Sequence, residues 1–354
     1  MNPIGFTVVF LSGLIGGYAP LPVKFMRRYG YEHWGLVTAF LGYFAIPWLA
    51  LFAICPDVPG ALSDVPLRAF LVGNAFSMAW GLANVLYCIS LLKIGFSLTT
   101  GILAGIAIPA GVVTPMILKG SGKFAEAPAP LSPGGLVVLA GVAIMLVGVV
   151  LLSRAGFARD AARGGWTPGI GPQGADGKAS RGGFVAGLVM CVAAGILSIG
   201  ISFSYVYTQD TIGQAFLAHG TGEASAPGAV RTVTLLGGAL VNLLFPLFLL
   251  WRNRSWGVFA GEGSRLDFAR AAAVGAVTIV SFVMASTGMS LLGGWGPSVG
   301  FGVNQAMQIL GSQSVGLIFG EWRGVPRPAV RTMVWGVILL LLAVAVISCG
   351  NAVQ

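Results

Sequence analysis

The chain contains 354 residues, of which 56% are hydrophobic and only 9% are charged. A soluble globular protein carries about 25% charged residues, so this composition excludes a protein whose whole surface faces water. The formal net charge of +9 would suit a nucleic-acid-binding protein, but the positions of the basic residues, described below, indicate a membrane instead.

The chain is apolar enough to cross a bilayer many times. A transmembrane helix needs about 20 consecutive, mostly apolar residues, and ten stretches of this kind occur. We therefore predict an all-α membrane protein. The predicted spans are 4–24, 35–55, 69–92, 96–118, 134–153, 184–207, 229–251, 268–292, 297–320 and 329–349.

Polar side chains in the first five spans are concentrated in the third span. Such side chains are costly in lipid and usually face the interior of the bundle or a water-filled cavity. The first span contributes Tyr18 at about half its depth. In the third span, at ~100° per residue, four residues fall within about 80° of one another and form one stripe: Ser77, Trp80, Asn84 and Tyr87.

Residues 156–182 form the longest loop between spans. They are rich in Gly and basic residues, and we predict a flexible cytoplasmic linker there. The linker separates residues 1–155, with five spans, from residues 183–354, also with five. Polar residues in the spans of the second part are Ser198, Ser202, Asn242, Asn304, Gln305 and Gln308.

The two parts are expected to have opposite orientations, because each contains an odd number of spans. They are also weakly similar in sequence. "SLLKIGFSLTTG" at 90–101 matches "SLLGGWGPSVGFG" at 290–302 with one inserted residue. Together these features predict a 5+5 inverted repeat, an architecture that typically has a binding site at the membrane midplane and alternating access.

The basic residues predict the orientation. Sixteen of the 20 Lys and Arg residues lie in odd-numbered loops, and the four in even-numbered loops are Arg68, Lys119, Lys123 and Arg231. By the positive-inside rule the odd-numbered loops are cytoplasmic and both termini lie outside. The basic surplus therefore indicates a lipid bilayer as the partner, and no nucleic acid.

No carboxylate is predicted at the centre of a span. Glu32 and Glu321 lie near cytoplasmic ends, and Asp210 lies just beyond the outer end of the sixth span. We take these three as candidates for proton coupling, although residues at such positions are more often simply solvated. His33 and His219 are placed in loops, and the four Cys residues lack metal-ligand spacing. We expect no metal and no cofactor.

The polar residues of the spans suit a neutral sugar. A single Ser in a span is explained by an interhelical hydrogen bond worth ~0.6 kcal/mol. Amides, however, bind hydroxyl groups, and aromatic rings pack against the C–H groups of a sugar. An enzyme would need a nucleophile, a metal cluster or an acid–base pair, and a structural membrane protein would not need amide stripes. The expected sugar-binding residues are Trp80, Asn84, Tyr87, Asn242, Asn304 and Gln308, followed by Tyr18, Ser198, Ser202 and Gln305.

An ordered series of short motifs resembles the bacterial L-rhamnose–proton symporter family. The resemblance touches nearly the whole chain. The motifs are "YAP" at 18–20, "WGLANVLY" at 80–87, "GFSLTTGILAGI" at 95–106, "TP" at 114–115, "SRAG" at 153–156, "SIGISF" at 198–203, "GGALVN" at 237–242, "GEW" at 320–322 and "RP" at 327–328.

The resemblance implies the ten-helix fold of the drug/metabolite transporter superfamily and proton symport of L-rhamnose or a related deoxysugar across the bacterial inner membrane. In the family that the chain resembles, the segment opening the ninth span carries Asp and His, whereas "GPSVGFGVNQAMQ" here carries neither. The resemblance therefore implies a sugar as the substrate more firmly than it implies L-rhamnose in particular, and it implies proton coupling least firmly. A carrier not coupled to protons, or a carrier of another small metabolite, is the alternative. We expect a monomer or a weak homo-oligomer.

Overall fold

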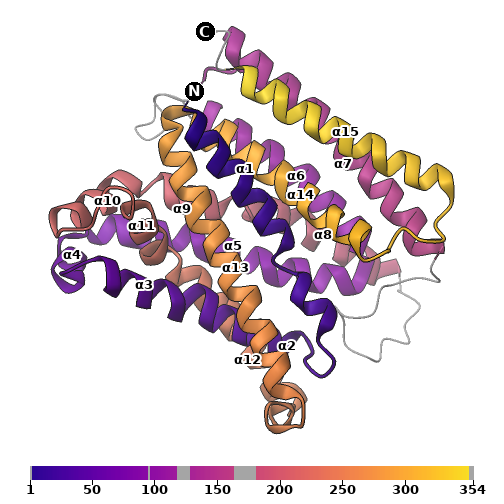
Figure 1. Cartoon of the computed structure of the whole chain (residues 1–354), viewed down its shortest axis with the longest axis horizontal. Coiled ribbons are helices and arrows are strands. Elements are labelled where there is room, and N and C mark those ends of the chain that lie inside the picture. The colour runs from indigo at the N-terminus through magenta and orange to yellow at the C-terminus, as the bar shows by residue number, and fades with distance from the viewer. Residues whose placement is uncertain (1, 95, 118–127, 163–180, 351–354) are drawn as a thin grey trace.

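The computed structural model describes residues 2–94, 96–117, 128–162 and 181–350, and every regular element among them is a helix. Figure 1 shows their arrangement. The elements before residue 163 are α1 (Pro3–Tyr18), η1 (Leu21–Phe25), α2 (Tyr31–Thr38), η2 (Ala39–Ala45), α3 (Ile46–Ile54), α4 (Val58–Asp64), α5 (Leu67–Ile94), α6 (Phe96–Ile117) and α7 (Pro133–Ala162).

The later elements follow the predicted linker. Residues 163–180 of that linker lie outside the described residues, and its flanks belong to α7 and α8. The later elements are α8 (Arg181–Leu197), α9 (Gly200–Val206), α10 (Gln209–Ala218), α11 (Ala226–Thr234), α12 (Leu236–Asn253), η4 (Trp256–Ala260), α13 (Ser264–Leu291), η5 (Gly293–Trp295), η6 (Gly296–Gly300), α14 (Phe301–Ile318) and α15 (Arg327–Cys349).

Nine helical segments within the described ranges are long and apolar enough to cross a membrane. They correspond to every predicted span except the ninth. At that place the chain does form a helix, α14, but its 18 residues include Asn304, Gln305, Gln308, Ser312, Gln313 and Ser314. These six polar residues lower its hydropathy, although the segment is buried against α1, α6 and α15.

Two of the predicted spans that follow the linker are interrupted. The sixth is divided into α8 and α9, with the break at Ser198 and Ile199, and the seventh into α11 and α12, with the break at Leu235. At the first break the Ser198 hydroxyl donates to the carbonyl of Gly195 (2.7 Å). The residues around both breaks are apolar or small, so the hydropathy of the sequence does not change there and did not indicate the breaks.

Large apolar side chains cover the sides of the helices. Leu49, Leu71, Val189 and Leu244 are all more than half exposed. In a water-soluble protein such a surface would aggregate, whereas lipid chains solvate it. The exposed side chains therefore agree with the spans found from length and composition.

The helices pack in a recurring pattern. α1 lies along α13 and α14, while α8 lies along α5 and α6. α12 packs on α5, and α2 and η2 pack on α13. α7 and α15 run side by side along one edge of the molecule, and α3, α4, α10 and α11 gather at another (Figure 1).

Apolar clusters fill the bundle, and three of them concern the site. The largest joins α1, α6, α7, α14 and α15, and a second joins α3, α4, α9, α10 and α11. A third and smaller cluster contains buried Trp80, Leu235 and Ile279, with half-buried Tyr43 and Phe282 packed against it. This third cluster collects side chains from α5, α13 and η2, and the candidate site is built around it.

The loops at the two ends of the bundle differ in charge. At one end, residues 19–30, 254–263 and 319–326 meet, and we call this the basic end. There the Asp267 carboxylate accepts the backbone N–H groups of Arg27 (3.0 Å) and Arg28 (2.8 Å). At the other end residues 55–66, 207–225 and 292–300 lie together, and we call this the acidic end. There His219 contacts Asp57.

Candidate functional site

Three aromatic rings from three helices meet inside the bundle. Tyr43 of η2 and Trp80 of α5 have ring centroids 5.5 Å apart, and Trp80 and Phe282 of α13 are also 5.5 Å apart, both pairs edge-on. Tyr43 and Phe282 are stacked at 6.2 Å. All three distances are in the range in which aromatic pairs attract. We call these residues the aromatic cluster.

A π-helical segment positions Tyr43. η2 ends just before Pro47, which has no N–H and so cannot donate a hydrogen bond to the carbonyl of Tyr43 four residues earlier. The wider turn of the π-helix leaves room for the carbonyl that Pro47 cannot pair with, and π-helical turns are frequent at functional sites. The sequence analysis missed Tyr43, although the wide turn follows from the Pro47 that interrupts an apolar span.

A pair of amides lies one helical turn from Trp80. The Asn84 side chain of α5 donates from Nδ2 to Oδ1 of Asn242 in α12 (3.1 Å), and Asn242 donates to the carbonyl of Gly238 (2.8 Å). Gly81 permits this approach, because a Cβ at that position would lie 2.8 Å from the Cβ of Val241. Among the described residues none donates a hydrogen bond to the side-chain oxygen Oδ1 of Asn84. The predicted residues Trp80, Asn84 and Asn242 are thus brought together.

The remaining predicted amides lie around α1. Asn304 of α14 donates to the Ser12 hydroxyl (2.7 Å), and Ser281 of α13 donates to the Ser12 carbonyl (2.9 Å). The Gln308 amide and the Ser281 hydroxyl both lie beside Gly16, within 3.2 Å of where its Cβ would be. These residues form a second polar group, distinct from the Asn84–Asn242 pair.

The second polar group and the aromatic cluster meet at adjacent positions of α13. Ser281 contacts the second group, while the next residue, Phe282, belongs to the aromatic cluster. α13 therefore connects the second polar group with the aromatic cluster, but the predicted amides do not form one contiguous set. That they line a single pocket stays a prediction.

Other predicted residues have less distinctive surroundings. The Tyr18 hydroxyl hydrogen-bonds the Ser314 hydroxyl (2.7 Å), and Ser202 is buried. Gln305 is half-buried in α14. Tyr87 and Tyr43 are both half-buried.

The three predicted ionisable candidates lie near the ends of helices. Glu321 forms ion pairs with Lys24 and with Arg159 (2.9 Å for the latter), and its side chain is 18% exposed. Glu32 accepts weaker hydrogen bonds from Asn253 (3.3 Å) and Ser255 (3.4 Å). Glu321 is thus more strongly partnered than Glu32.

Several buried polar groups were wrongly placed by the sequence. Arg231, assigned to an outer loop, lies in α11 and is 3% exposed. His33, also assigned to a loop, lies in α2, where it is buried and its Nε2 contacts the Ser255 carbonyl (3.0 Å). Asp267, which was not among the predicted site residues, is buried in the first turn of α13. A charged or polar residue near the end of an apolar stretch looks like a loop residue by hydropathy, so hydropathy gave no sign that these residues are buried.

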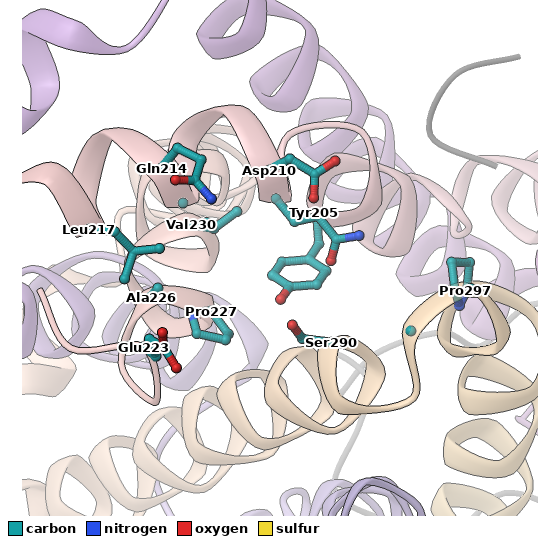
Figure 2. Close-up of a pocket in the computed structure, with 14 residues that line it drawn as sticks. Tyr205, Asp210, Gln214, Leu217, Glu223, Ala226, Pro227, Val230, Ser290 and Pro297 are labelled. Carbon is teal, nitrogen blue, oxygen red and sulfur yellow. The ribbon is translucent and has the colours of Figure 1, made fainter. Parts of the chain in front are cut away.

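A pocket of about 710 Å³ opens at the acidic end (Figure 2). Among the predicted site residues, only Asp210 lines it. Gln209, Gln214, Glu223 and Ser290 also line the pocket and were missed. The first three were expected in a loop, where polar residues look like ordinary solvated ones, and a single Ser in a span looks like an interhelical contact. No group of His, Cys, Asp and Glu suitable for holding a metal ion occurs in the described part of the chain.

Comparison with known proteins decides the family. The family model described as L-rhamnose-proton symport protein matches residues 6–353. The chain belongs to this family. A relative named L-rhamnose-proton symporter from Pectobacterium atrosepticum is 26% identical and covers 99% of both chains. Relatives of the same name from Cronobacter sakazakii and Escherichia coli are 25% and 24% identical, and each alignment covers 94% of this chain. The resemblance found from the short motifs is thereby confirmed.

The family and the apolar helices both indicate a membrane protein. The nine described segments that can cross a membrane make the chain a multi-pass membrane protein of a transporter family. The identity of about a quarter leaves most positions different from those of the relatives, so the substrate must be argued from the site of this chain.

Proposed function

We propose that this protein is a secondary transporter that carries a neutral monosaccharide, L-rhamnose or a related deoxysugar, together with protons. The observation that carries the proposal is the amide pair Asn84–Asn242 beside the aromatic cluster. An aromatic face and adjacent amides provide the two kinds of contact that a sugar ring requires. The family and the names of the relatives supply the substrate class.

The proposed architecture is a ten-helix 5+5 inverted repeat of the drug/metabolite transporter type, with residues 1–155 and 183–354 as the repeats. Packing supports it when α1, α5, α6 and α7 are matched with α8, α13, α14 and α15. α1 against α13 and α14 then corresponds to α8 against α5 and α6. Likewise α12 against α5 corresponds to α2 against α13, and α6 against α7 to α14 against α15. Each of these contacts thus has its counterpart.

The proposed sugar site lies between the aromatic cluster and the two polar groups. Trp80 and Tyr87 stack on the sugar ring, and Asn84, Asn242, Asn304 and Gln308 hold its hydroxyls. Among the described residues the one buried carboxylate is Asp267, in the first turn of α13 at the basic end, and the lack of one near the aromatic cluster favours a neutral substrate over a cationic one. Access alternates between the two ends of the bundle.

Glu321 is the proposed proton-coupling residue, ahead of Glu32 and Asp210. It is partly buried and bridges Lys24 of the first repeat with Arg159 near the linker. Protonation would remove the charge that holds both cations, so proton binding would loosen the basic end. This couples a protonation event to the contact between the repeats.

The protein is proposed to lie in the bacterial inner membrane with its basic end in the cytoplasm and both termini outside. Arg27, Arg28, Arg252, Arg254 and Arg323 all lie at or near the basic end, as the positive-inside rule requires of a cytoplasmic face. On this orientation the pocket of Figure 2 opens to the outside.

Uptake of labelled L-rhamnose into proteoliposomes, with and without an inward proton gradient, tests the function. Accumulation that follows the gradient supports symport. Uptake that ignores the gradient would make the protein an uncoupled carrier, and no uptake of this sugar or of related deoxysugars would reject the substrate class.

The Asn84→Ala variant tests the site. We expect L-rhamnose affinity to fall about tenfold, the effect of losing one or two hydrogen bonds of about 0.5–1.5 kcal/mol each. Ser312→Ala is the matched control, since Ser312 is exposed and donates to the carbonyl of Ile309 in its own helix. Equal affinity in the two variants would contradict the assignment of Asn84.

A further inference from the structure

The pocket at the acidic end presents hydrogen-bonding groups to incoming solutes. Its wall is formed by α9, α10, α11 and the end of α13, and Figure 2 shows Tyr205 projecting between Asp210 and Ser290. The volume of about 710 Å³ is within the range of about 300–1,000 Å³ that small-molecule sites occupy. Gln214 and Glu223 complete a rim of carboxylate and amide groups.

The inner wall of this pocket is an aromatic ring resting on a buried cation. Tyr205 is 1% exposed, and its hydroxyl points toward Ser290 (Figure 2). The guanidinium carbon of Arg231 lies 5.1 Å from the centre of the Tyr205 ring, a cation–π contact. Arg231 is itself 3% exposed, so Tyr205 separates the pocket from the guanidinium.

Behind the wall, Arg231 connects directly to the aromatic cluster. Its Nε donates to the Ser286 hydroxyl (2.8 Å), which in turn donates to the carbonyl of Phe282 (2.9 Å). Its Nη1 donates to the carbonyl of Ile201 (2.6 Å), and the Ile201 side chain packs against the cluster. Phe282, Ser286 and Ser290 succeed one another at four-residue intervals, about 6 Å apart along α13. The pocket, the wall and the aromatic cluster are therefore three successive levels on one helix.

The bonds of Arg231 are all to neutral groups. No ion pair joins Arg231 to a carboxylate in the described part of the chain. A buried charge without a counter-ion is costly and marks a functional position in a membrane protein. The hydroxyls of a sugar are acceptors of the same kind as Ser286 and the Ile201 carbonyl. Exchanging one acceptor for the other therefore changes little in energy.

We propose that the pocket is a first binding site for the sugar, and that Tyr205 on Arg231 is the wall through which the sugar passes to the aromatic cluster. The inference rests on the proposed sugar transport. The rim carboxylates and amides hold the hydroxyls, and Arg231 then exchanges its Ser286 and Ile201 acceptors for sugar oxygens. Tyr205 moves aside when Arg231 releases its bonds.

Thiol labelling from the acidic-end side tests the wall without any sugar. The background replaces Cys55, Cys88, Cys191 and Cys349 by Ala and carries Ile201→Cys, which keeps the backbone carbonyl that Arg231 uses. We expect Tyr205→Ala to raise the labelling rate by a membrane-impermeant reagent about tenfold, as loss of one cation–π contact would.

The matched control for the wall is Tyr205→Phe, which keeps the ring over Arg231 and loses only the hydroxyl. We expect it to label at the rate of the background. Thermal melting of each variant checks that the fold is retained. If Ile201→Cys is labelled no faster in a folded Tyr205→Ala variant than in Tyr205→Phe, the proposal that Tyr205 forms the wall is overturned.

Protection of a rim cysteine tests the first binding site. In the same background carrying Gln214→Cys in place of Ile201→Cys, we expect L-rhamnose to slow labelling at concentrations near the KM for uptake. Protection by tetraethylammonium but not by L-rhamnose would overturn the assignment to a sugar. If L-rhamnose is taken up but does not slow labelling of Gln214→Cys, the first binding site is overturned and the transport function stands. If L-rhamnose is neither taken up nor protective, while Tyr205→Ala still speeds labelling of Ile201→Cys, the proposed transport function is rejected.

Discussion

Gly81 provides a sharp test of how the amide pair is held. Replacing it with Ala places a Cβ 2.8 Å from the Cβ of Val241, 3.0 Å from the Gly238 carbonyl oxygen and 3.3 Å from Nδ2 of Asn242. The Val241 Cβ and the Gly238 carbonyl oxygen cannot move independently of the α12 backbone, so α5 and α12 must move apart. Overpacking of this kind costs about 1–3 kcal/mol. The same movement stretches the 3.1 Å bond between Asn84 and Asn242.

Gly105 offers the matched control. It also lies inside a membrane-spanning helix, α6, but a Cβ there would have no neighbour within 4 Å. Gly105→Ala should therefore gain stability, by up to about 1 kcal/mol of helix propensity. We expect thermal melting in detergent to show Gly81→Ala below the parent and Gly105→Ala at or above it, with uptake of labelled L-rhamnose reduced only in Gly81→Ala. Equal melting temperatures and equal uptake in the two variants would refute the packing argument.

Two further predictions concern the ends of the bundle. Glu321→Gln should lower stability by about 1–3 kcal/mol by removing the ion pair between Glu321 and Arg159, and should abolish the dependence of uptake on the proton gradient; gradient-driven uptake like that of the parent would contradict the coupling role. The pKa of His219 is raised above 6.5 by hydrogen bonds to Asp64 and Asp57, while the pKa of the Asp57 carboxyl is lowered by the Gly60 N–H and by His219. The stabilisation from the contacts of His219 at the end of α10 with Asp57 and Asp64 at the ends of α4 should therefore be complete just below pH 6.5. It should be lost as the pH rises through the raised pKa of His219, because the imidazole then loses its charge. It should also be lost as the pH falls through the lowered pKa of Asp57, because the carboxylate is then protonated. An NMR titration of His219 that is unchanged in Asp64→Asn would show the hydrogen bonds to be irrelevant.

The sequence predicted most of the helices because each needs only a run of about 20 apolar residues. It also predicted α14, which composition alone would reject for its amides and serines. It did not predict the breaks at Ser198 and Leu235, since both lie within apolar stretches. The fold within each span therefore depends on contacts between helices, which hydropathy does not register.

The candidate site was predicted in part. The spacing of Trp80 and Asn84 places them on one helix face, and that face does point at another helix. The partner Asn242 could not be assigned from the sequence, because nothing in one helix specifies its neighbour. Tyr43 and Phe282 were missed because an aromatic residue in an apolar span looks the same whether it faces lipid or a partner ring.

Arg231 shows most clearly what the sequence could not reveal. Counted as a loop charge, it seemed to contribute only to the charge balance between the two faces of the membrane. In the structure its bonds to Ser286 and Ile201 place it between the pocket and the aromatic cluster. A charge in this position can only be inferred once the three-dimensional path from Ser290 to Phe282 is known.

The two ends of the bundle are held with different strength, and this bears on which end yields first. At the basic end, Asp267 is 2% exposed and accepts three backbone N–H groups from residues 27–29, and Glu321 is partly buried between two cations. At the acidic end, His219 pairs with Asp57 and Asp64, whose side chains are more than half exposed. Exposed ion pairs contribute about 0–1 kcal/mol, whereas hydrogen bonds to a buried charge contribute about 1.5–3 kcal/mol each. The acidic end, where the pocket opens, is therefore held more weakly than the basic end. If the protein carries a sugar as proposed, we expect the sugar to meet the smaller barrier at the acidic end, and we expect opening of the basic end to require the proposed protonation of Glu321.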